Sequence, residues 1–361
     1  NLADMRDLLR TWLSLTETEL GRVERFQPAG ARATVEPKLG WFQARLELDD
    51  ARLRKIVVRH PPLLLKSVES MESNCDWLQR RLGLDAAQLK KVVLRSPPLL
   101  YYSIEDNMEP TLDWLRRRLD LDDVGLRKLV LRLPSLLGNS VEANMAPTLE
   151  WLQDRLNLDT AQLKKVVLGR PSLLGYSVED NMAPKLDWLQ TRLELDAAQL
   201  KKLVVAQPTL LGYSVDANMA PTLDWLQTRL DLDDAGLRKV VLVKPQLLNY
   251  SVEDNMAPTL EWLQTRLDLD DAGLRKVVLV KPQLLGYSVE DNMEPKLEWL
   301  QKRLDLDDLG LRKMVLVSPP LLGYSIENNM EPKLCFFEEE LGLSLSRVRA
   351  SIVSAPSRLG L

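Results

Sequence analysis

Pairs of neighbouring basic residues recur through the chain at a nearly constant interval, and such pairs could bind phosphate groups. The pairs are Arg54/Lys55, Lys90/Lys91, Arg127/Lys128, Lys164/Lys165, Lys201/Lys202, Arg238/Lys239, Arg275/Lys276 and Arg312/Lys313. On a helical wheel the second member points away from the neighbouring apolar residues and into solvent. A ladder of exposed cations suits a phosphate backbone, but exposed lysines are also ordinary on helix surfaces, so both interpretations stay open. Arg59, Arg95 and Arg132 belong to the same set of candidates.

A second basic position lies four residues after each tryptophan of a regular series. It is occupied by Arg45, Arg81, Arg118, Arg155, Arg192, Arg229, Arg266 and Arg303. At this spacing on a helix the guanidinium group can lie over the indole ring. We interpret these pairs mainly as structural contacts that pack successive modules together. Arg81 and Arg118 are kept as candidate contacts to a nucleic acid.

A third position varies while its surroundings do not, on either side of a recurring proline. The residues before the proline are His60, Ser96, Leu133, Arg170, Gln207, Lys244, Lys281 and Ser318, and those after it are Pro62, Pro98, Ser135, Ser172, Thr209, Gln246, Gln283 and Pro320. Polar side chains of differing donor and acceptor type, one per module, are what a base-reading surface needs. The alternative is neutral drift at a tolerant helix end. The candidate contacts here are His60, Arg170, Gln207, Lys244 and Lys281.

No residue pattern indicates an active site. His60 is the single histidine, and Cys75 and Cys335 lie far apart in the chain, so neither a metal-ligand cluster nor a disulfide framework is indicated. The recurring serines, such as Ser251, stand where a helix is approached and suit capping better than nucleophilic attack. The glycines occur singly and form no phosphate-cradling loop. We therefore expect neither enzyme activity nor a cofactor or metal.

All these positions follow a period of 37 residues, which a series of tryptophans marks most clearly. Trp77, Trp114, Trp151, Trp188, Trp225, Trp262 and Trp299 follow one another at 37 residues, with Trp41 at 36 before them and Phe336 at 37 after them. A fixed period of roughly 20–50 residues is typical of stacked supersecondary units. The sequence thus predicts an all-α superhelical solenoid of about ten modules, each made of two helices and a 3₁₀ turn.

The first helix of a module is predicted from an apolar stripe and a proline. In residues 251–287 the stripe is Met256, Leu260, Leu263 and Leu267. We expect Asn255 to cap this helix and Pro258 to fall in its first turn, where the missing N–H costs nothing. The same pairing recurs at Asn107/Pro110, Asn144/Pro147, Asn181/Pro184, Asn218/Pro221, Asn292/Pro295 and Asn329/Pro332.

The second helix of the same module is bounded by an aspartate and a proline. Asp270 is expected to cap it, and its inner face is formed by Leu274, Val277 and Val278. Pro282 should end the helix, because the residue before a proline is pushed out of the α region. The residues that follow, 284–288, are too few for an α-helix and predict a 3₁₀ turn with two buried leucines.

The repeat extends over the whole chain, so we expect one continuous array over residues 1–361. Residues 1–36 form a degenerate N-terminal module, 37–330 the regular modules and 331–361 a degenerate C-terminal capping module. In the first of these, Leu15, Leu20, Val23 and Pro28 keep the spacing of a second helix, while Trp12 is displaced by four residues. Degenerate ends are expected where a module must turn a polar face outward.

The composition fits a well-packed helical protein. Hydrophobic residues make up 45% of the chain and charged residues 28%. No stretch approaches the roughly 18 consecutive apolar residues that a membrane span needs, so we expect no membrane contact. The cysteine usage favours a reducing compartment. Because repeat-like sequence is reached already by Trp12, we expect no targeting peptide within this chain.

The proline–leucine–leucine turn, combined with this period, is a specific signature. In one module it is carried by Leu274, Pro282, Leu284, Leu285, Ser288, Asn292, Pro295, Leu297 and Leu300, with equivalents throughout. The pattern resembles the repeat of the mitochondrial transcription termination factor (mTERF) family. The resemblance implies triangular modules of two α-helices and one 3₁₀ helix in a left-handed superhelix. It further implies nucleic-acid binding along the concave side, in mitochondria or chloroplasts, to terminate transcription or otherwise regulate organellar gene expression.

The charge balance departs from that family pattern, whose members are expected to be basic. The chain has 48 Lys+Arg against 52 Asp+Glu, a formal net charge of −4. Many of the acids stand at helix starts, where carboxylates belong whatever the ligand is. Residues 1–100 carry 17 basic and 13 acidic residues, so the N-terminal third is the better landing site for a nucleic acid.

Two functions are compatible with the sequence. The first is a monomeric nucleic-acid-binding solenoid, with double-stranded DNA expected before RNA; at roughly 9–10 Å per module, ten modules would follow some 25 base pairs. The second is an acidic scaffold for protein partners, a common role of solenoids. Binding that weakens with salt would separate the first from the second.

Overall fold

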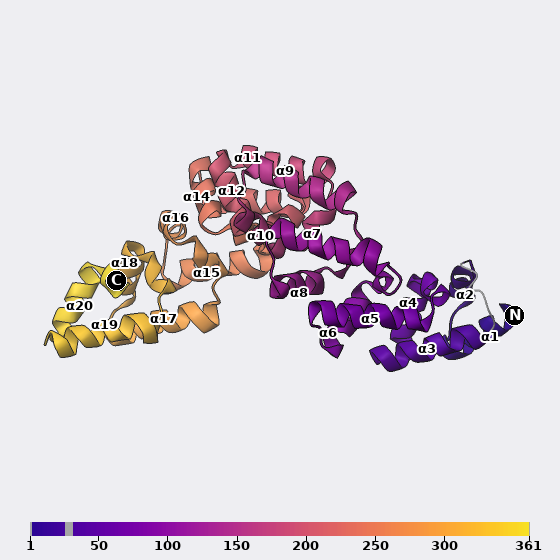
Figure 1. Cartoon of the computed structure of the whole chain (residues 1–361). Coiled ribbons are helices and arrows are strands. Elements are labelled where there is room, and N and C mark those ends of the chain that lie inside the picture. Colours follow the sequence, from indigo (N-terminus) through magenta and orange to yellow (C-terminus); the bar gives the residue numbers. More distant parts are fainter. Residues whose placement is uncertain (1, 26–31, 361) are drawn as a thin grey trace. The chain divides into compact units, whose positions relative to one another are not determined.

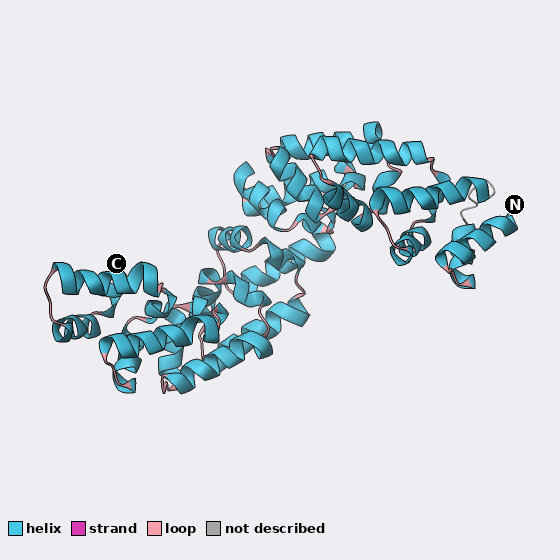
Figure 2. Cartoon of the chain, turned by 90° about the horizontal axis from the view of Figure 1, so that it is seen from below, coloured by secondary structure: helices cyan, strands magenta, loops and turns pink. Residues whose placement is uncertain are grey.

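The computed structural model describes residues 2–25 and 32–360. Regular structure in these ranges is entirely helical, without a strand, and forms the all-α solenoid expected from the period (Figures 1 and 2). The chain comprises two compact units, Asn1–Val178 and Glu179–Leu361, and the 37-residue pattern runs through each. Pro28, which was expected to mark the degenerate first module, lies outside the described residues.

Each module contributes two α-helices. The first helices are α1 (Leu2–Leu13), α3 (Arg32–Leu46), α5 (Val68–Leu82), α7 (Glu109–Leu119), α9 (Ala146–Leu156), α11 (Ala183–Arg192), α13 (Ala220–Arg229), α15 (Ala257–Arg266), α17 (Glu294–Leu304) and α19 (Glu331–Cys335). The second helices are α2 (Glu17–Glu24), α4 (Asp50–Arg59), α6 (Ala86–Arg95), α8 (Asp123–Arg132), α10 (Thr160–Gly169), α12 (Ala197–Ala206), α14 (Asp234–Val243), α16 (Asp271–Val280), α18 (Asp308–Val317) and α20 (Leu345–Ser354).

Two kinds of short element complete the modules. A 3₁₀ turn follows each second helix from α4 on: η1 (Pro61–Leu65), η2 (Pro97–Leu100), η4 (Pro134–Gly138), η6 (Pro171–Gly175), η8 (Pro208–Gly212), η10 (Pro245–Asn249), η12 (Pro282–Gly286), η14 (Pro319–Gly323) and η17 (Pro356–Leu359). A π turn precedes the first helix in most modules: η3 (Ile104–Met108), η5 (Val141–Met145), η7 (Val178–Met182), η9 (Val215–Met219), η11 (Val252–Met256), η13 (Val289–Met293) and η15 (Ile326–Met330), with a further one, η16 (Phe336–Glu340), after α19.

The boundaries of the second helix are those predicted from the sequence. Asp270 caps α16 by accepting a hydrogen bond from the main-chain nitrogen of Gly273 at 2.8 Å. The helix ends at Val280, and Pro282 opens the 3₁₀ turn η12. Lys281 between them has φ −136° and ψ 70°, outside the α region, as the clash with a following proline requires.

The start of the first helix differs from the prediction. Ser251 caps the π turn η11 that leads into α15, since its hydroxyl accepts from the main-chain nitrogen of Asp254 at 3.0 Å, and Asn255 lies inside this π turn instead of capping. In that turn the nitrogen of Met256 bonds to the carbonyl of Ser251, five residues back. A proline inside a helix clashes with the carbonyl four residues earlier, and a wider π turn relieves such a clash. The π turn therefore lets the helix begin one turn before Pro258.

The core is built from the apolar stripes that the period predicts. Met256, Leu260 and Leu263 of the first helix are fully buried, and so are Leu274, Val277 and Val278 of the second. The two leucines of the 3₁₀ turn, Leu284 and Leu285, complete the same core. Each such side chain contributes about 1.5–3 kcal/mol when fully buried.

In several modules a tyrosine after the 3₁₀ turn lies against the 3₁₀ turn of the next module. A Cβ atom on Gly286 would lie 2.7 Å from Cε2 of Tyr250, and one on Gly138 would lie 2.2 Å from Cε2 of Tyr102. A side chain at Gly286 would therefore have to displace the aromatic ring of the preceding module, although η10 ends in Asn249 instead of glycine.

Replacing Gly286 by alanine should lower the free energy of unfolding by about 1–3 kcal/mol, because the new methyl group displaces the Tyr250 ring. Urea denaturation followed by circular dichroism measures the change. Gly175→Ala is the matched control, since its nearest neighbour would be Nδ2 of Asn139 at 3.9 Å and the substitution should be close to neutral. Equal losses for the two variants would contradict this role of the tyrosine.

Candidate nucleic-acid interface

The outer lysine surface is defined here as the second members of the basic pairs on the second helices. It comprises Lys55, Lys91, Lys128 and Lys165 in the unit Asn1–Val178 and Lys202, Lys239, Lys276 and Lys313 in the unit Glu179–Leu361. Every one of these lysines is exposed, as the helical wheel predicted. In the part of the chain that the structure describes, none of them forms an ion pair. Their charges are thus available to a ligand.

No carboxylate interrupts the outer lysine surface along a helix. From four residues before each lysine to four residues after it, the sequence contains neither aspartate nor glutamate, as in residues 235–243 around Lys239. The acids of the second helices stand instead at the N-cap and first turn, such as Asp233 and Asp234. The surface is therefore locally positive although the chain carries a net charge of −4.

The first members of the basic pairs have a structural role. Lys164 donates from Nζ to the carbonyl oxygen of Asp120 at 2.6 Å, and Arg312 binds the carboxylate of Asp268 at 2.7 Å. In each case the acceptor is the left-handed residue that ends the first helix of the preceding module. A cation at a helix C-terminus is favourable because the last carbonyls are unsatisfied there.

The same arrangement recurs along the array. Lys90 binds the carbonyl of Glu47, Arg127 that of Leu82, Arg238 the carbonyl and carboxylate of Glu194, and Arg275 the carbonyl of Leu230 and the carboxylate of Asp231. Arg54 differs, because it binds the carboxylate of Glu19 in the first turn of α2. Lys201 occupies the equivalent position of α12 and is half-buried. These residues interlock the modules, which the sequence pattern did not reveal because the acceptor lies some 44 residues away.

A second basic column accompanies the lysines only in the first unit. Arg59, Arg95 and Arg132 follow their lysines by four residues and are exposed. Arg95 and Arg132 also donate to carbonyls at the end of the next second helix, Leu131 at 3.0 Å and Leu168 at 2.5 Å. In the second unit this column is apolar, with Val243, Val280 and Val317 at 45%, 48% and 64% exposure. The first unit therefore presents the denser positive surface.

The arginines that follow the tryptophans bridge modules through carboxylate and amide oxygens. Glu109 of α7 accepts both from the indole Nε1 of Trp77, at 3.0 Å, and from Nε of Arg81, at 2.7 Å. Arg118 donates to Gln153 of the next module at 2.6 Å. This geometry agrees with the expected role of these arginines in packing modules together. The guanidinium group of Arg81, however, contacts the carboxylate that it shares with Trp77 and does not lie over the indole ring.

In the second unit the bridge extends from helix to helix. Arg266 donates to Glu294 at 2.9 Å and to Gln301 at 2.7 Å, and Gln301 in turn donates to Asp308 of α18 at 2.7 Å. At the end of the array two hydrogen bonds from Arg303 hold the pKa of Glu338 below its usual value. These side chains are engaged within the protein.

Three of the variable residues beside the prolines contact side chains of their own module. Arg170 donates to the hydroxyl of Tyr176 at 2.8 Å, Gln207 donates to Thr209 at 2.6 Å, and Lys244 lies 5.6 Å from the centre of the Tyr250 ring. Lys281 is half-buried beside the turn of the next module. Their side chains are partly accessible, so a role in selecting a ligand stays a prediction.

Titratable groups of catalytic type offer little reactivity. Burial lowers the pKa of His60, and Arg59 beside it lowers the pKa further, so the imidazole is mostly uncharged at neutral pH. Burial raises the pKa of Cys75 to about 12, which keeps its thiol protonated. Within residues 2–25 and 32–360 no cluster of metal-ligating side chains is found. No helix in those ranges is both long enough and apolar enough to cross a bilayer.

Replacing Arg266 by alanine should lower the free energy of unfolding by about 1–2 kcal/mol, since Glu294 and Gln301 lose a charged donor. The same substitution at Lys276, an exposed residue of the following second helix, should change it by less than about 0.5 kcal/mol. Denaturant titration of both variants measures the difference. Similar losses would show that the basic residues do not divide into structural and free ones.

Comparisons with known proteins agree with this architecture. The family model described as mTERF matches residues 78–361, from the end of α5 to the last 3₁₀ turn. Comparison with curated proteins gives no match. The matched range takes in the outer lysines from Lys91 to Lys313 and every 3₁₀ turn from η2 on. Because the match covers well over half of the chain, the protein belongs to the mTERF family, whose members are nucleic-acid-binding helical-repeat proteins of organellar gene expression.

Proposed function

We propose that this protein binds double-stranded DNA through the outer lysine surface and thereby regulates organellar gene expression, with transcription termination as the outcome. The observation that carries the proposal is the ladder of exposed lysines, one per module, which the protein itself leaves unpaired. A cation that is free in the folded protein can neutralise a phosphate and release a counterion. The inner cations on the same helices cannot do so without breaking a contact between modules.

The spacing of the ladder supports a duplex as the ligand. Stacked helix pairs advance by roughly 9–10 Å, which corresponds to about three base pairs. Four lysines in each unit would then contact phosphates spread over about one turn of B-form DNA. Phosphate contacts of this kind fix position without reading sequence. Sequence selection would fall to the variable residues Arg170, Gln207, Lys244 and Lys281.

The first unit is the stronger candidate for the initial encounter. Its outer lysines are accompanied by Arg59, Arg95 and Arg132, whereas the second unit has valines at the equivalent places. Long-range attraction grows with the local density of charge and raises the association rate. Membership of the mTERF family supports an organelle, the mitochondrion or the chloroplast, as the site of action.

Neutralising four outer lysines of the first unit, Lys55, Lys91, Lys128 and Lys165, by glutamine should weaken duplex binding. The slope of log affinity against log salt should fall by about 0.9 for each lysine that contacts a phosphate. Fluorescence anisotropy with labelled duplex DNA, single-stranded DNA and RNA between about 50 and 200 mM salt measures both quantities.

A charge-matched variant provides the control for this experiment. Arg80, Arg117, Lys66 and Lys302 are exposed cations that lie outside the second helices, and their replacement by glutamine removes the same charge. This variant should keep the wild-type slope. An unchanged slope in the lysine variant, or no binding to duplex DNA at about 50 mM salt, would refute the proposal. Tighter binding to RNA than to the duplex would reassign the ligand.

A further inference from the structure

A buried lysine of the second unit, Lys296, shows how this repeat binds an ammonium group. Lys296 of α17 is only 9% exposed, and its Nζ donates to Oδ1 of Asn292 at 2.8 Å and to the carbonyl oxygen of Leu322 at 3.0 Å. The same nitrogen lies 5.9 Å from the centre of the Tyr287 ring, within the range of a cation–π contact. Glu327 adds a negative charge nearby, and Lys281 adds a positive one. Together these groups form an ammonium site that the protein fills with its own side chain.

The two preceding modules keep this site but lack the lysine. Thr259 and Thr222 stand at the position of Lys296. The residues around the lysine have equivalents of the same type in both modules. Around Thr259 they are Tyr250, Asn255, Leu285 and Glu290, and around Thr222 they are Tyr213, Asn218, Leu248 and Glu253. A threonine is too short to reach the acceptors that Lys296 uses. Thr259 instead donates to the main-chain oxygen of Asn255 at 2.8 Å.

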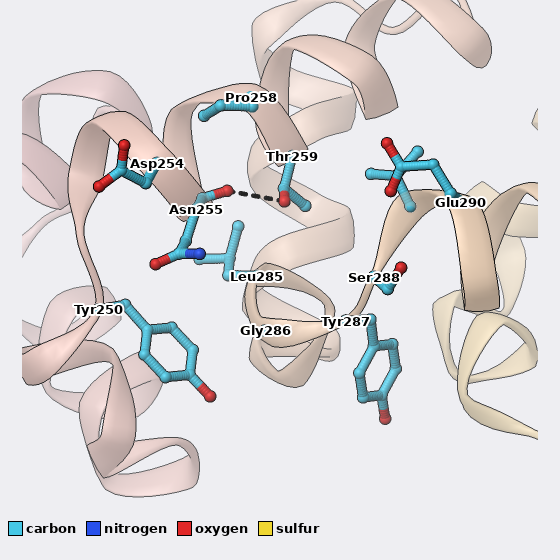
Figure 3. A pocket seen from close by; sticks show the side chains of 11 residues that line it. Tyr250, Asp254, Asn255, Pro258, Thr259, Leu285, Gly286, Tyr287, Ser288 and Glu290 are labelled. Carbon is cyan, nitrogen blue, oxygen red and sulfur yellow. Dashed lines mark hydrogen bonds between the residues drawn. The ribbon is translucent and has the colours of Figure 1, made fainter.

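At Thr259 and Thr222 the structure has an open groove. The groove at Thr259 has a volume of about 420 Å³, and the groove at Thr222 about 400 Å³. Figure 3 shows Tyr250, Asn255 and Thr259 around the first of these, with Tyr287 on the other side of Gly286. Both volumes fall within the range of small-ligand sites. Each groove is lined by equivalents of all the groups that hold Lys296 in its own module.

A second occurrence of the internal lysine supports this assignment. Lys185, one module before Thr222, donates to Oδ1 of Asn181 at 2.8 Å and to the carbonyl of Leu211 at 3.1 Å. These acceptors correspond to Asn292 and Leu322. The position thus holds a lysine that occupies the site in some modules, whereas Thr222 and Thr259 leave the site open.

We propose that the two threonine grooves bind two lysine side chains of one extended basic segment of a partner protein. Tyr250 lines both grooves, so they adjoin. An extended chain rises about 3.3–3.6 Å per residue, and three residues match a module step of roughly 9–10 Å. The segment therefore carries a Lys-X-X-Lys pattern. Glu253, Asp254 and Glu290 line the grooves and complement its charge.

This binding surface is separate from the outer lysine surface. The grooves are lined by residues of the 3₁₀ turns, the π turns, the first helices and the segments that join them, and no residue of a second helix takes part. The same repeat thus offers cations on one element and anionic, tyrosine-lined grooves on others. A nucleic acid and a basic protein segment can bind without competing for side chains.

The test measures binding of a labelled peptide, Gly-Lys-Ser-Ser-Lys-Gly, to the full chain by fluorescence anisotropy. The matched peptide with norleucine in place of lysine should bind at least about tenfold more weakly, because it lacks the ammonium groups. The double variant T222K/T259K should lose affinity by a similar factor, since its own lysines fill the grooves as Lys185 and Lys296 do. Circular dichroism should show an intact fold, because the repeat accommodates lysine at this position.

Two further variants keep the proposal falsifiable. Lys296→Thr should open a third groove, so that a peptide with three lysines at this spacing binds about tenfold more tightly than to the wild type. Lys239→Gln with Lys276→Gln should leave peptide binding unchanged while weakening nucleic-acid binding, which separates this inference from the proposed function. The inference is overturned when T222K/T259K binds the peptide as well as the wild type, when the norleucine peptide binds equally, or when no binding occurs.

Discussion

Stacking of each module on the next is the interaction on which the rest of the structure depends. A helix pair with one 3₁₀ turn cannot enclose its own apolar face. In the array Leu260, Leu263 and Leu274 are fully buried. Each buried leucine contributes about 1.5–3 kcal/mol, whereas a partly exposed ion pair contributes about 0.2–1 kcal/mol. The stability of the stack is therefore mainly hydrophobic. The polar contacts between modules, such as Arg266 with Glu294, fix the register in which the apolar faces meet.

The local elements were predictable from the sequence because their causes lie within a few residues. Asp270 caps α16, Pro282 ends it and the leucine pair forms a 3₁₀ turn, each for a reason of backbone geometry. The start of the first helix was predicted wrongly because two residues, Ser251 and Asn255, both suit a cap. The choice depends on the π turn that accommodates Pro258, and single-residue preferences contain no information about such a turn.

The contacts between modules could not be read from the sequence for a different reason. Lys164 and Lys165 are neighbours of the same type, yet the first binds the end of a helix in the preceding module and the second is exposed. Only the placement of α10 relative to the C-terminus of α7 distinguishes them. The sequence therefore could not distinguish the cations that bind another module from those that remain exposed. The net charge of the chain does not distinguish them either. A ligand can be bound only by those cations that are not paired with other groups of the protein.

The repeat explains how a chain with a net charge of −4 can offer surfaces of opposite sign. In each module most carboxylates stand at the starts of helices, where they offset the helix dipole, and the lysine two turns later is too far along the helix to be neutralised by them. Stacking then repeats this separation in every module, so that like charges line up along the array instead of cancelling. Because the core positions are nearly invariant between modules, a single residue can change a surface without disturbing the stack. At the position of Lys296 a threonine opens a groove and a lysine fills it. At the position four residues after each outer lysine, arginine makes the surface more positive and valine leaves it apolar.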